Sequence, residues 1–246
     1  MKTIKGKYAS AKVFTDNIED KASEQILTLC NQSFVDGCKI RIMPDVHAGS
    51  GCVIGFTANL GKKVIPNIVG VDIGCGMLVA ELGIEHIDPK KLDKVIRERV
   101  PAGMNVHESQ KMSDSFLSQF ECKDSLHNVD WILRSMGTLG GGNHFIEMDQ
   151  GEDGDFYLVI HSGSRHLGIE VTNFYINQGE KVLKEKGCSV PHETTYLEGQ
   201  LMQEYLEDLQ IVQKYADINR QAILAEIIKG MKWKVQDTYS CIHNYV

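Results

Sequence analysis

The sequence predicts an α+β protein in which short strands and long helices are joined by glycine-rich loops. Short apolar runs of strand-like composition border clusters of glycine. Longer segments carry apolar residues at steps of three and four, which is the helical period. No internal repeat, low-complexity stretch or linker divides the 246 residues. We therefore predict a single compact domain of mixed strands and helices.

Three apolar runs that are β-branched, aromatic or alternating are predicted to be strands. They cover residues 53–58, 77–82 and 156–160. Each run touches a cluster of glycines, so each strand is expected to open into a loop that can turn sharply. Residues 239–246 are predicted to form a strand or a loop at the active site.

Four helices are predicted between and after these strands. The first begins at Asp88, a typical helix cap, followed by Pro89 in the first turn. The second covers residues 123–136 and ends at Gly137, a typical C-terminal cap. The third and fourth, over residues 167–186 and 198–229, have the most regular apolar spacing.

The balance of charge is acidic, with 33 Asp and Glu against 26 Lys and Arg, and a formal net charge of −7. A protein that holds nucleic acid mainly through phosphate charge is normally basic. Any function on RNA or DNA is therefore expected to rest on a local site, on bound metal, or on residues outside this chain.

Cysteine usage and hydropathy predict a cytoplasmic protein. The seven cysteines are an odd number, and residues 1–7 have no apolar run behind them, so we expect no secretory signal and reduced thiols. No uninterrupted apolar stretch reaches about 18 residues, so no membrane span is predicted.

In residues 69–76, the carboxylate of Asp72 and the thiol of Cys75 lie in a glycine-rich turn. Glycine allows close backbone approach, so both side chains can point to one place. An Asp oxygen and a Cys thiolate that converge are a metal-ligand arrangement, and a thiolate can bridge two ions. The alternative is a turn with a capping Asp and a buried Cys that packs as a small hydrophobe.

The segment of residues 138–147 contains three consecutive glycines, whose backbone N–H groups can hold phosphate oxygens. If this segment is extended, Asn143, Phe145 and Glu147 share one face and His144 lies on the other. The segment matches neither a Walker A loop nor a dinucleotide fingerprint. A loop beside a strand, with His144 in the core, is the alternative.

A predicted strand ends on His161, and a helix is expected to begin near His166 after a short Ser-rich turn. Strand ends that open into loops are common places for ligand sites. His161 is therefore a candidate ligand, and Arg165 at the helix start is a candidate phosphate-binding group. Alternatively, the turn only caps the helix and Arg165 lies on the surface.

Two shorter segments hold further candidates. Residues 241–244 contain His243, although a lone His near the end of a sequence usually has no function. Residues 43–47 contain Asp45 and His47, which share one face if the segment is extended. These two are metal ligands, groups that hold the ligands in place, or part of a polar turn.

Together, five of these residues offer one carboxylate, one thiolate and three imidazoles: Asp72, Cys75, His144, His161 and His243. Structural zinc sites prefer paired Cys-x-x-Cys spacing, which this sequence lacks. Mixed O, N and S donors suit Mn, Fe or Zn in a catalytic site with open positions. Two ions bridged by the thiolate would fit phosphoryl chemistry, in which paired metals hold the attacking and leaving oxygens.

Five segments, in order along the chain, resemble the signature blocks of the RtcB family of RNA-splicing ligases. They are residues 43–47, 70–76, 140–147, 161–165 and 243–244, and residues 205–220 are similar to the family's long helix. The resemblance extends over nearly the whole chain. It implies that residues 1–246 are the N-terminal portion of one RtcB-like ligase domain.

This resemblance implies an enzyme that uses GTP and two Mn²⁺ ions to join RNA ends in tRNA splicing or RNA repair. One RNA end bears a 2′,3′-cyclic phosphate or a 3′-phosphate, and the other bears a 5′-hydroxyl. In the family reaction a His attacks the α-phosphate of GTP to form a His–GMP adduct. The GMP then passes to the RNA 3′-phosphate, and the 5′-hydroxyl displaces it.

The resemblance also implies roles for individual residues. Cys75 would bridge the two Mn²⁺ ions. Asp72 and His144 would be the other protein ligands of one ion, and His161 and His243 would be those of the second. The GTP pocket would be lined by Asn143, Phe145 and Glu147, and Arg165 would lie near the incoming RNA phosphate.

None of the nine His residues of this sequence lies in the family block that contains the nucleophilic His. The family's nucleophilic His lies well beyond the His-Asn segment, so we expect a C-terminally incomplete ligase domain. Such a chain would keep much of the metal site but would not form the adduct by itself. The alternatives are a metal-dependent phosphodiesterase or hydrolase that needs no nucleotide, and a non-catalytic RNA-binding module.

Overall fold

The computed structural model describes residues 1–49 and 51–246 and confirms the α+β class. The chain divides into two compact units, each with its own sheet and its own apolar core. Unit 1 comprises Met1–Val71, Thr172–Tyr205 and Val246, and unit 2 comprises Asp72–Val171 and Leu206–Tyr245. That residues 1–246 form part of one ligase domain stays a prediction.

Unit 1 contains a four-stranded sheet in the order β1-β2-β3-β4 and a separate two-stranded pair, β5 with β9. Its elements are β1 (Lys2–Lys5), β2 (Ser10–Val13), α1 (Asp20–Cys30), η1 (Ser33–Val35), β3 (Lys39–His47), β4 (Ile54–Asn59), β5 (Lys63–Val64), α2 (Pro66–Val69), η4 (His192–Thr194) and β9 (Leu197–Glu198). Two long helices, α5 (His166–Glu185) and α6 (Gly199–Met231), contribute residues to both units.

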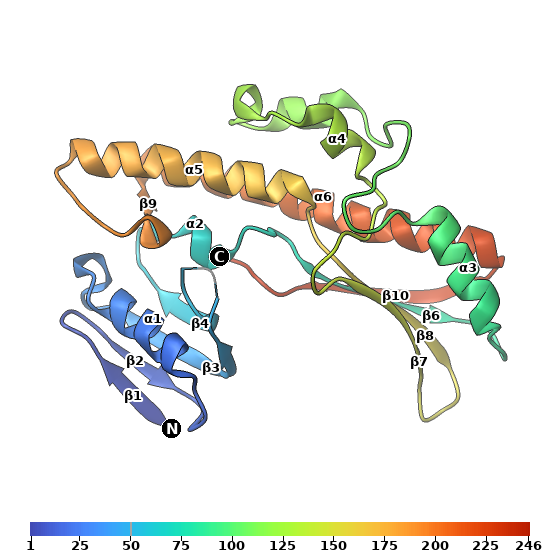
Figure 1. Ribbon diagram of the computed structural model, residues 1–246, viewed down its shortest axis with the longest axis horizontal. Helices are drawn as coiled ribbons and strands as arrows, with labels where there is room; N and C mark the ends of the chain where they lie inside the picture. Colours follow the sequence, from blue (N-terminus) through green and yellow to red (C-terminus); the bar gives the residue numbers. More distant parts are fainter. Residues whose placement is uncertain (50) are drawn as a thin grey trace. The chain divides into compact units, whose positions relative to one another are not determined.

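Helix α1 covers one face of the four-stranded sheet (Figure 1). Its buried residues Ala22, Ile26 and Leu29 recur at helical spacing and belong to the same core cluster as the strand residues that alternate inward. On β2 and β3, Ala11, Val13, Ile40 and Ile42 are buried while the residues between them are not. Because strand side chains alternate, the other face of this sheet carries polar residues.

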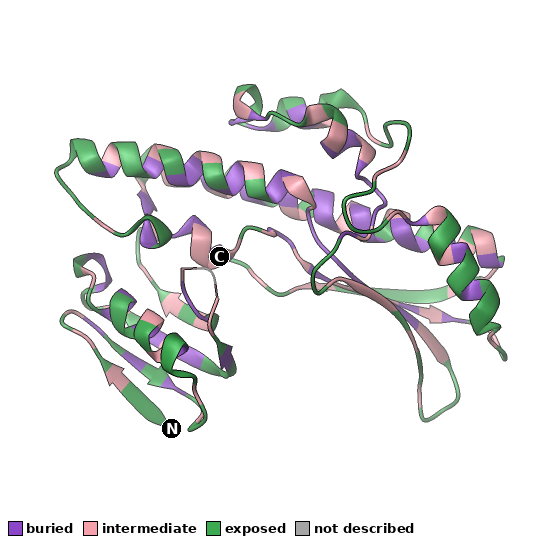
Figure 2. Ribbon diagram, viewed as in Figure 1, coloured by how far each residue is buried: buried purple, intermediate pink, exposed green. Residues whose placement is uncertain are grey.

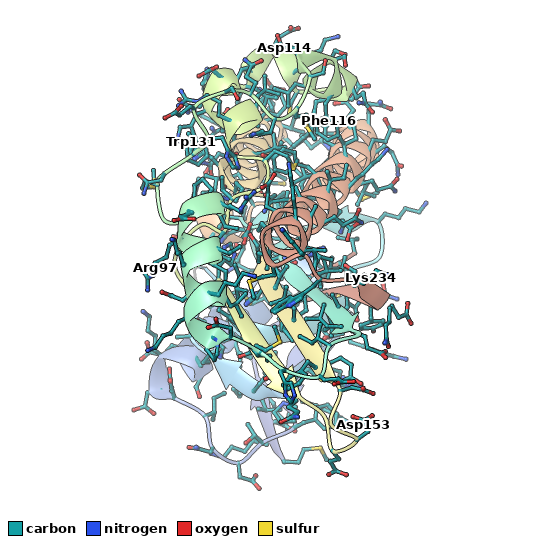
Figure 3. All side chains as sticks on the ribbon, turned by 90° about the vertical axis from the view of Figure 1, so that its right-hand side faces the viewer. Arg97, Asp114, Phe116, Trp131, Asp153 and Lys234 are labelled. Carbon is teal, nitrogen blue, oxygen red and sulfur yellow. The ribbon has the colours of Figure 1, made fainter. Side chains whose placement is uncertain are left out.

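Unit 2 contains an antiparallel sheet in the order β10-β6-β8-β7. Its elements are β6 (Gly76–Leu82), α3 (Pro89–Arg99), η2 (Asp114–Gln119), η3 (Lys123–Ser125), α4 (Val129–Arg134), β7 (Phe145–Gln150), β8 (Phe156–Ser162), β10 (Val235–Ile242) and the greater part of α6. Figure 3 labels Asp153 in the turn between β7 and β8, and Trp131 on α4.

The core of unit 2 lies between this sheet and helices α3 and α6. Leu78, Ala80 and Ile160 from the sheet pack with Val95 of α3 and Ile223 of α6. Figure 2 shows buried residues recurring along α6, whereas much of α3 is exposed. The long helix α6 therefore packs against the sheet of unit 2.

Most of the predicted elements are confirmed. The three predicted strands appear as β4, β6 and β8, and the two long helices appear as α5 and α6. Asp88 caps α3 as expected, because its side chain accepts a hydrogen bond from the backbone N–H of Lys91 at 3.0 Å. The segment after residue 239 belongs partly to β10, which ends at Ile242.

The helix predicted over residues 123–136 is wrong in its length. The structure has a 3₁₀ turn, η3, then a break, and then the short helix α4. The reason is a tertiary contact, since the backbone N–H groups of His127 and Asn128 donate to the carboxylate of Glu170 on α5. Those N–H groups are therefore not used inside a continuous helix.

Within the described part of the chain, no helix is both long enough and apolar enough to cross a membrane.

Candidate metal centre

The five predicted metal ligands lie at one end of the unit 2 sheet. Asp72 and Cys75 precede β6, and His144 immediately precedes β7. His161 lies near the end of β8, and His243 follows β10. Since β6 and β7 run antiparallel to β8 and β10, the starts of the first two strands meet the ends of the other two.

The register of the strands brings the side chains into contact. Ile242 pairs with Gly76, and the backbone N–H of His243 donates to the carbonyl oxygen of Cys75 at 3.0 Å. On the other side of β6, Met77 pairs with His161, which in turn pairs with Phe145 of β7. Residues separated by up to 171 positions in sequence, 72 and 243, are therefore neighbours in the fold.

The thiol of Cys75 lies at the centre of the cluster. Its Sγ is 3.2 Å from Nε2 of His161 and 3.7 Å from Nε2 of His144. Nε2 of His144 is 2.9 Å from Oδ2 of Asp72, and Nε2 of His161 is 3.2 Å from Nε2 of His243. All five side chains thus present potential ligand atoms toward one region.

These atoms form two groups of three that share Cys75. One group is Asp72, Cys75 and His144, the other is Cys75, His161 and His243, and the ligand atoms within each group all lie within 4.8 Å of one another. Sulfur, imidazole nitrogen and carboxylate oxygen together suit a divalent transition ion. The donor set therefore fits two ions with one shared thiolate, and the ligand roles themselves stay a prediction.

The orientation of His144 is typical of a metal ligand. Its Nδ1–H donates to the carbonyl oxygen of Leu139 at 2.8 Å, so Nε2 is left facing the Asp72 carboxylate. A neutral imidazole in this tautomer has a lone pair on Nε2, and two lone pairs at that separation repel unless a proton or a metal ion lies between them. Metal-binding His residues usually donate their second N–H in this way.

Asp72 is fixed by the turn that follows β8. Its Oδ1 accepts hydrogen bonds from the backbone N–H of Ser164 at 2.9 Å and from the Ser164 hydroxyl at 3.2 Å. Oδ2 remains directed at His144. Although burial opposes ionisation, the hydrogen bonds and charge interaction with His144 and the contact with Ser164 hold the pKa of Asp72 below its usual value.

The thiol of Cys75 and the imidazoles of His161 and His243 have pKa values shifted in opposite directions. Burial raises the pKa of Cys75 to about 12, and the negative charge of Asp72 adds to the rise. Burial lowers the pKa of His161, helped by the neighbouring His243, and burial together with Arg220 lowers that of His243. Without metal, these two imidazoles are neutral near pH 7 while the thiol keeps its proton.

Two adjacent residues of α6 hold the loops that carry the ligands. Arg220 is fully buried, and its Nη1 donates to the carbonyl oxygens of Gly74 at 2.8 Å and Ser162 at 2.9 Å, each next to a predicted ligand. Asn219, also fully buried, accepts the N–H groups of Gly137 and Thr138 through Oδ1.

The amide nitrogen of Asn219 extends this network to His144. It donates to the carbonyl oxygens of Thr138 and Gly163 and to Oγ of Ser162. The Ser162 hydroxyl donates to the same Leu139 carbonyl that receives His144 Nδ1–H. One helix therefore sets the positions of three separate ligand loops through buried, directional hydrogen bonds.

The sequence interpretation missed the positioning role of Asn219, Arg220 and Ser162. A signal was present in α6, because the polar pair falls on the apolar face of the helical pattern, between Ala216 and Ile223. Buried Asn and Arg are uncommon unless their hydrogen bonds are satisfied by partners. Which partners they have is set by loops distant in sequence.

Two glycines are required because other groups occupy the space beside them. A Cβ on Gly140 would collide with the guanidinium of Arg165 and crowd Nδ1 of His144, and Gly140 also has a φ of +88°. A Cβ on Gly163 would collide with the carboxylate of Asp72. A Cβ on Gly141, by contrast, would meet only Cα of Gly103 at 3.7 Å.

Arg165 has a left-handed backbone, with a φ of 59°, directly before α5. Its Nε donates to Oγ1 of Thr138 at 2.9 Å, and its Nη2 donates to the carbonyl oxygen of Gly103 at 3.0 Å. The guanidinium also lies over the ring of Trp131 at 5.9 Å. Such strain in a non-glycine residue is common at functional sites. Its role toward RNA phosphate stays a prediction.

The residues predicted to bind GTP lie next to the cluster in sequence, on or beside β7. The ring of Phe145 is 5.1 Å from that of His161, with the two planes tilted by 73°. Asn143 and Glu147 are exposed. The strand begins at Phe145, so the alternation expected from residue 143 onward applies only from 145. Their role in nucleotide binding stays a prediction.

Asp45 and His47 lie in unit 1, on β3, and both are exposed. Nδ1 of His47 is 2.8 Å from the carbonyl oxygen of Asp45, so its ring N–H donates to that oxygen. That Asp45 and His47 support the metal ligands stays a prediction.

Comparison with known proteins places the chain among RNA ligases. A family model described as tRNA-splicing ligase RtcB matches residues 25–129 and 119–246. RNA-splicing ligase RtcB of Escherichia coli strain K12 is 27% identical over 281 residues, which cover 97% of this chain and 67% of that protein. The tRNA-splicing ligase RtcB of Archaeoglobus fulgidus is 27% identical over 263 residues, 84% of this chain and 54% of its own length. The chain therefore spans about two thirds of the bacterial relative and about half of the archaeal one.

The shared position of Cys75 predicts how substitutions change metal content. Cys75→Ala should lose both divalent ions because one sulfur serves both groups, whereas His161→Ala should lose mainly one. Metal analysis of each variant after loading with Mn²⁺ and gel filtration tests this. Cys188→Ala, which alters an exposed thiol, is the matched control and should keep the full content. Undiminished metal in Cys75→Ala would rule out the bridging role.

The raised pKa of Cys75 predicts that metal binding depends on pH. The thiol is protonated at any pH well below about 12, so its ligation as thiolate releases one proton. His161 and His243 are already neutral above pH 7 and release none. Between about pH 7 and 9, affinity for Mn²⁺ should rise by about tenfold per pH unit. Titration of the chain with Mn²⁺ in a weakly buffered solution should release about one proton per chain. An affinity for Mn²⁺ that does not change with pH would contradict ligation by the thiolate.

The close packing of Gly163 against Asp72 predicts a sensitive site. Gly163→Ala should displace the carboxylate and weaken metal binding by roughly tenfold or more, as changes to groups that orient metal ligands commonly do. Gly141→Ala adds the same methyl group where space exists and should leave affinity unchanged. Calorimetric titration with Mn²⁺ measures both. Equal affinities would mean that Asp72 does not need its observed position.

Proposed function

The chain belongs to the RtcB family of tRNA-splicing ligases, and from that membership we propose that it is the metal-binding part of a GTP- and Mn²⁺-dependent RNA ligase. The enzyme joins 2′,3′-cyclic phosphate or 3′-phosphate ends to 5′-hydroxyl ends in RNA splicing or repair. Seven free cysteines are consistent with a cytoplasmic location.

The observation that carries this proposal is the convergence of four ligand-type side chains, those of Asp72, His144, His161 and His243, on the Cys75 sulfur. Structural sites that only stabilise a fold usually close around one ion with paired Cys and His. Here one thiol is shared by two mixed groups, and His243 at the edge of the cluster is exposed. A shared ligand with an accessible edge suits a pair of catalytic ions better than a structural one.

In this assignment Asp72, His144 and Cys75 hold one Mn²⁺, and Cys75, His161 and His243 hold the other. The bound pair would supply Lewis-acid stabilisation of phosphate oxygens that attack or leave. The protein's part is to keep the donors in place. Asn219 and Arg220 hold the ligand loops, and Leu139 fixes the tautomer of His144.

The nucleotide and the RNA are assigned to the neighbouring residues. Asn143, Phe145 and Glu147 would line the GTP pocket, and the position of the Phe145 ring beside His161 supports a bound group near the cluster. Arg165 would contact the RNA phosphate. Support comes from its fixed, strained conformation against Thr138 and Gly103, because a preorganised guanidinium loses little entropy when it binds phosphate.

The histidine that forms the His–GMP adduct is assigned to a family block outside residues 1–246. Three of the chain's nine His residues are used as ligands in this proposal. Of the others, His107 donates from Nε2 to the carbonyl oxygen of Gly137, and His166 and His192 contact Glu170 and Glu180. None of these contacts resembles a nucleophile held beside the Cys75 cluster.

Incubation with α-labelled GTP, Mn²⁺ and RNA ends tests the proposed reaction. A form of the chain extended by the family's C-terminal block should acquire an acid-labile label and should ligate the RNA. The 246-residue chain should bind Mn²⁺ but acquire no label. Cys75→Ala in the extended form should abolish both labelling and ligation, with Cys188→Ala as the matched control.

The outcomes separate the alternatives. Acid-labile label on the 246-residue chain would contradict the assignment of the adduct to an outside histidine. Opening of the cyclic phosphate with metal alone, without GTP, would favour the phosphodiesterase. RNA binding that is unaffected by Cys75→Ala, with no labelling or ligation in the extended form, would favour a non-catalytic binding module.

A further inference from the structure

The solvent-facing side of the unit 1 sheet is basic, although the chain as a whole is acidic. The face opposite α1 presents Lys5 of β1, Lys12 of β2, and Lys39 and Arg41 of β3, with Lys7 in the β1–β2 turn. We define these five residues as the basic face. Across the four strands, Asp45 is the one acidic residue, and it lies on β3 within the register irregularity between Ile42 and His47.

The charges of the basic face are not neutralised within the described residues, because no ion pair with a carboxylate is formed by any of its five side chains. Lys5, Lys7, Lys12 and Lys39 are exposed, and Arg41 is half-buried. One guanidinium nitrogen of Arg41 donates to the carbonyl oxygen of Ile40 at 2.8 Å. Its remaining N–H groups can therefore bind an anion.

The strand register places like charges against each other. Lys12 pairs directly with Arg41, and the same row continues to Thr3 on one side and Thr57 on the other. Directly opposed like charges destabilise a sheet. This arrangement costs folding stability, and within the described residues neither Lys12 nor Arg41 forms an ion pair that would offset the cost. It therefore favours an anionic ligand.

A hollow opens beside these cations. It has a volume of about 440 Å³ and is lined by residues that include Lys7, Tyr8, Ser10, Lys39 and Arg41. Nζ of Lys7 lies 4.9 Å from the centroid of the Tyr8 ring, which is half-buried. A ring held at the edge of a positive groove is the combination on which single-stranded nucleic acid binds, with bases on the ring and phosphates on the cations.

We propose that the basic face binds the phosphate backbone of single-stranded RNA, as a contact surface separate from the metal ligands. The cations repeat across three adjacent strands, which suits a polyanion better than one compact anion. Flanking hydroxyl and amide groups of Thr3, Ser10, Thr57 and Asn59 can bond phosphate or ribose oxygens. The choice of RNA as the polyanion rests on the proposed ligase function, and the acidic net charge requires such a local basic site.

The test is fluorescence anisotropy of a labelled short single-stranded RNA with the 246-residue chain, in a chelator and without GTP. These conditions remove any contribution of metal and nucleotide, so the result is independent of ligase activity. Lys39→Gln with Arg41→Gln should reduce the affinity at about 50 mM salt by at least roughly tenfold. The slope of log affinity against log salt should fall by about 1.4, at about 0.7 per lost phosphate contact on a single strand.

The matched control removes two positive charges elsewhere. Lys90→Gln with Lys91→Gln alters exposed residues of α3 in unit 2 and should leave both affinity and slope unchanged. Lys39→Arg with Arg41→Lys keeps the charge and should retain most of the binding. Equal losses in the test and control pairs, or no loss in either, would overturn the proposal. If polyglutamate displaced the labelled RNA as well as unlabelled RNA does, the proposal would also be overturned. That result would assign the basic face to acidic proteins.

A second variant separates binding from folding. Lys12→Thr removes the repulsion with Arg41 and should raise the melting temperature while it weakens RNA binding. A structural role for Lys12 would instead lower the melting temperature. If RNA binds through the basic face but the extended chain neither takes up GMP label nor ligates, the proposed ligase function fails while this surface stands. The reverse result would remove the surface alone.

Discussion

The candidate metal centre depends on the register of one antiparallel sheet. Strands β10, β6, β8 and β7 place two strand beginnings and two strand ends at the same edge. A shift of one residue in the pairing of β8 would turn His161 to the opposite face, because strand side chains alternate, and shifts in the other pairs would displace the candidate ligands that lie just beyond the strand ends. The hydrogen bond from His243 N–H to Cys75 carbonyl oxygen continues the β10–β6 pairing to the ligands themselves. The pairing of the strands therefore sets the geometry of the candidate ligands.

Helix α6 both packs in the core of unit 2 and positions the loops that carry the candidate ligands. Its apolar residues, such as Ile223 and Ile227, pack on the sheet, while Asn219 and Arg220 bond the loops at the sheet edge. Buried amide and guanidinium groups are costly unless satisfied, so the loops are held in the arrangement that supplies their partners. This network holds the polar side chains of Asp72 and His144 facing each other.

Electrostatics differ between the two units. The candidate metal ligands of unit 2 combine a raised pKa of the Cys75 thiol with lowered pKa values of His161 and His243. Unit 1 instead concentrates unpaired lysines and Arg41 on one sheet face. A chain with net charge −7 thus has a local cluster of cations on this face.

The sequence by itself determined the α+β class, the long helices, the cap at Asp88 and the five residue types of the candidate centre, because these follow from local periodicity and from donor chemistry. Only the tertiary structure decided the break between η3 and α4, since the backbone of residues 127 and 128 bonds Glu170 rather than its own helix. It also decided the positioning roles of Asn219 and Arg220 and the opposition of Lys12 and Arg41. All of these arise from strand register and long-range contacts, which local sequence patterns do not encode.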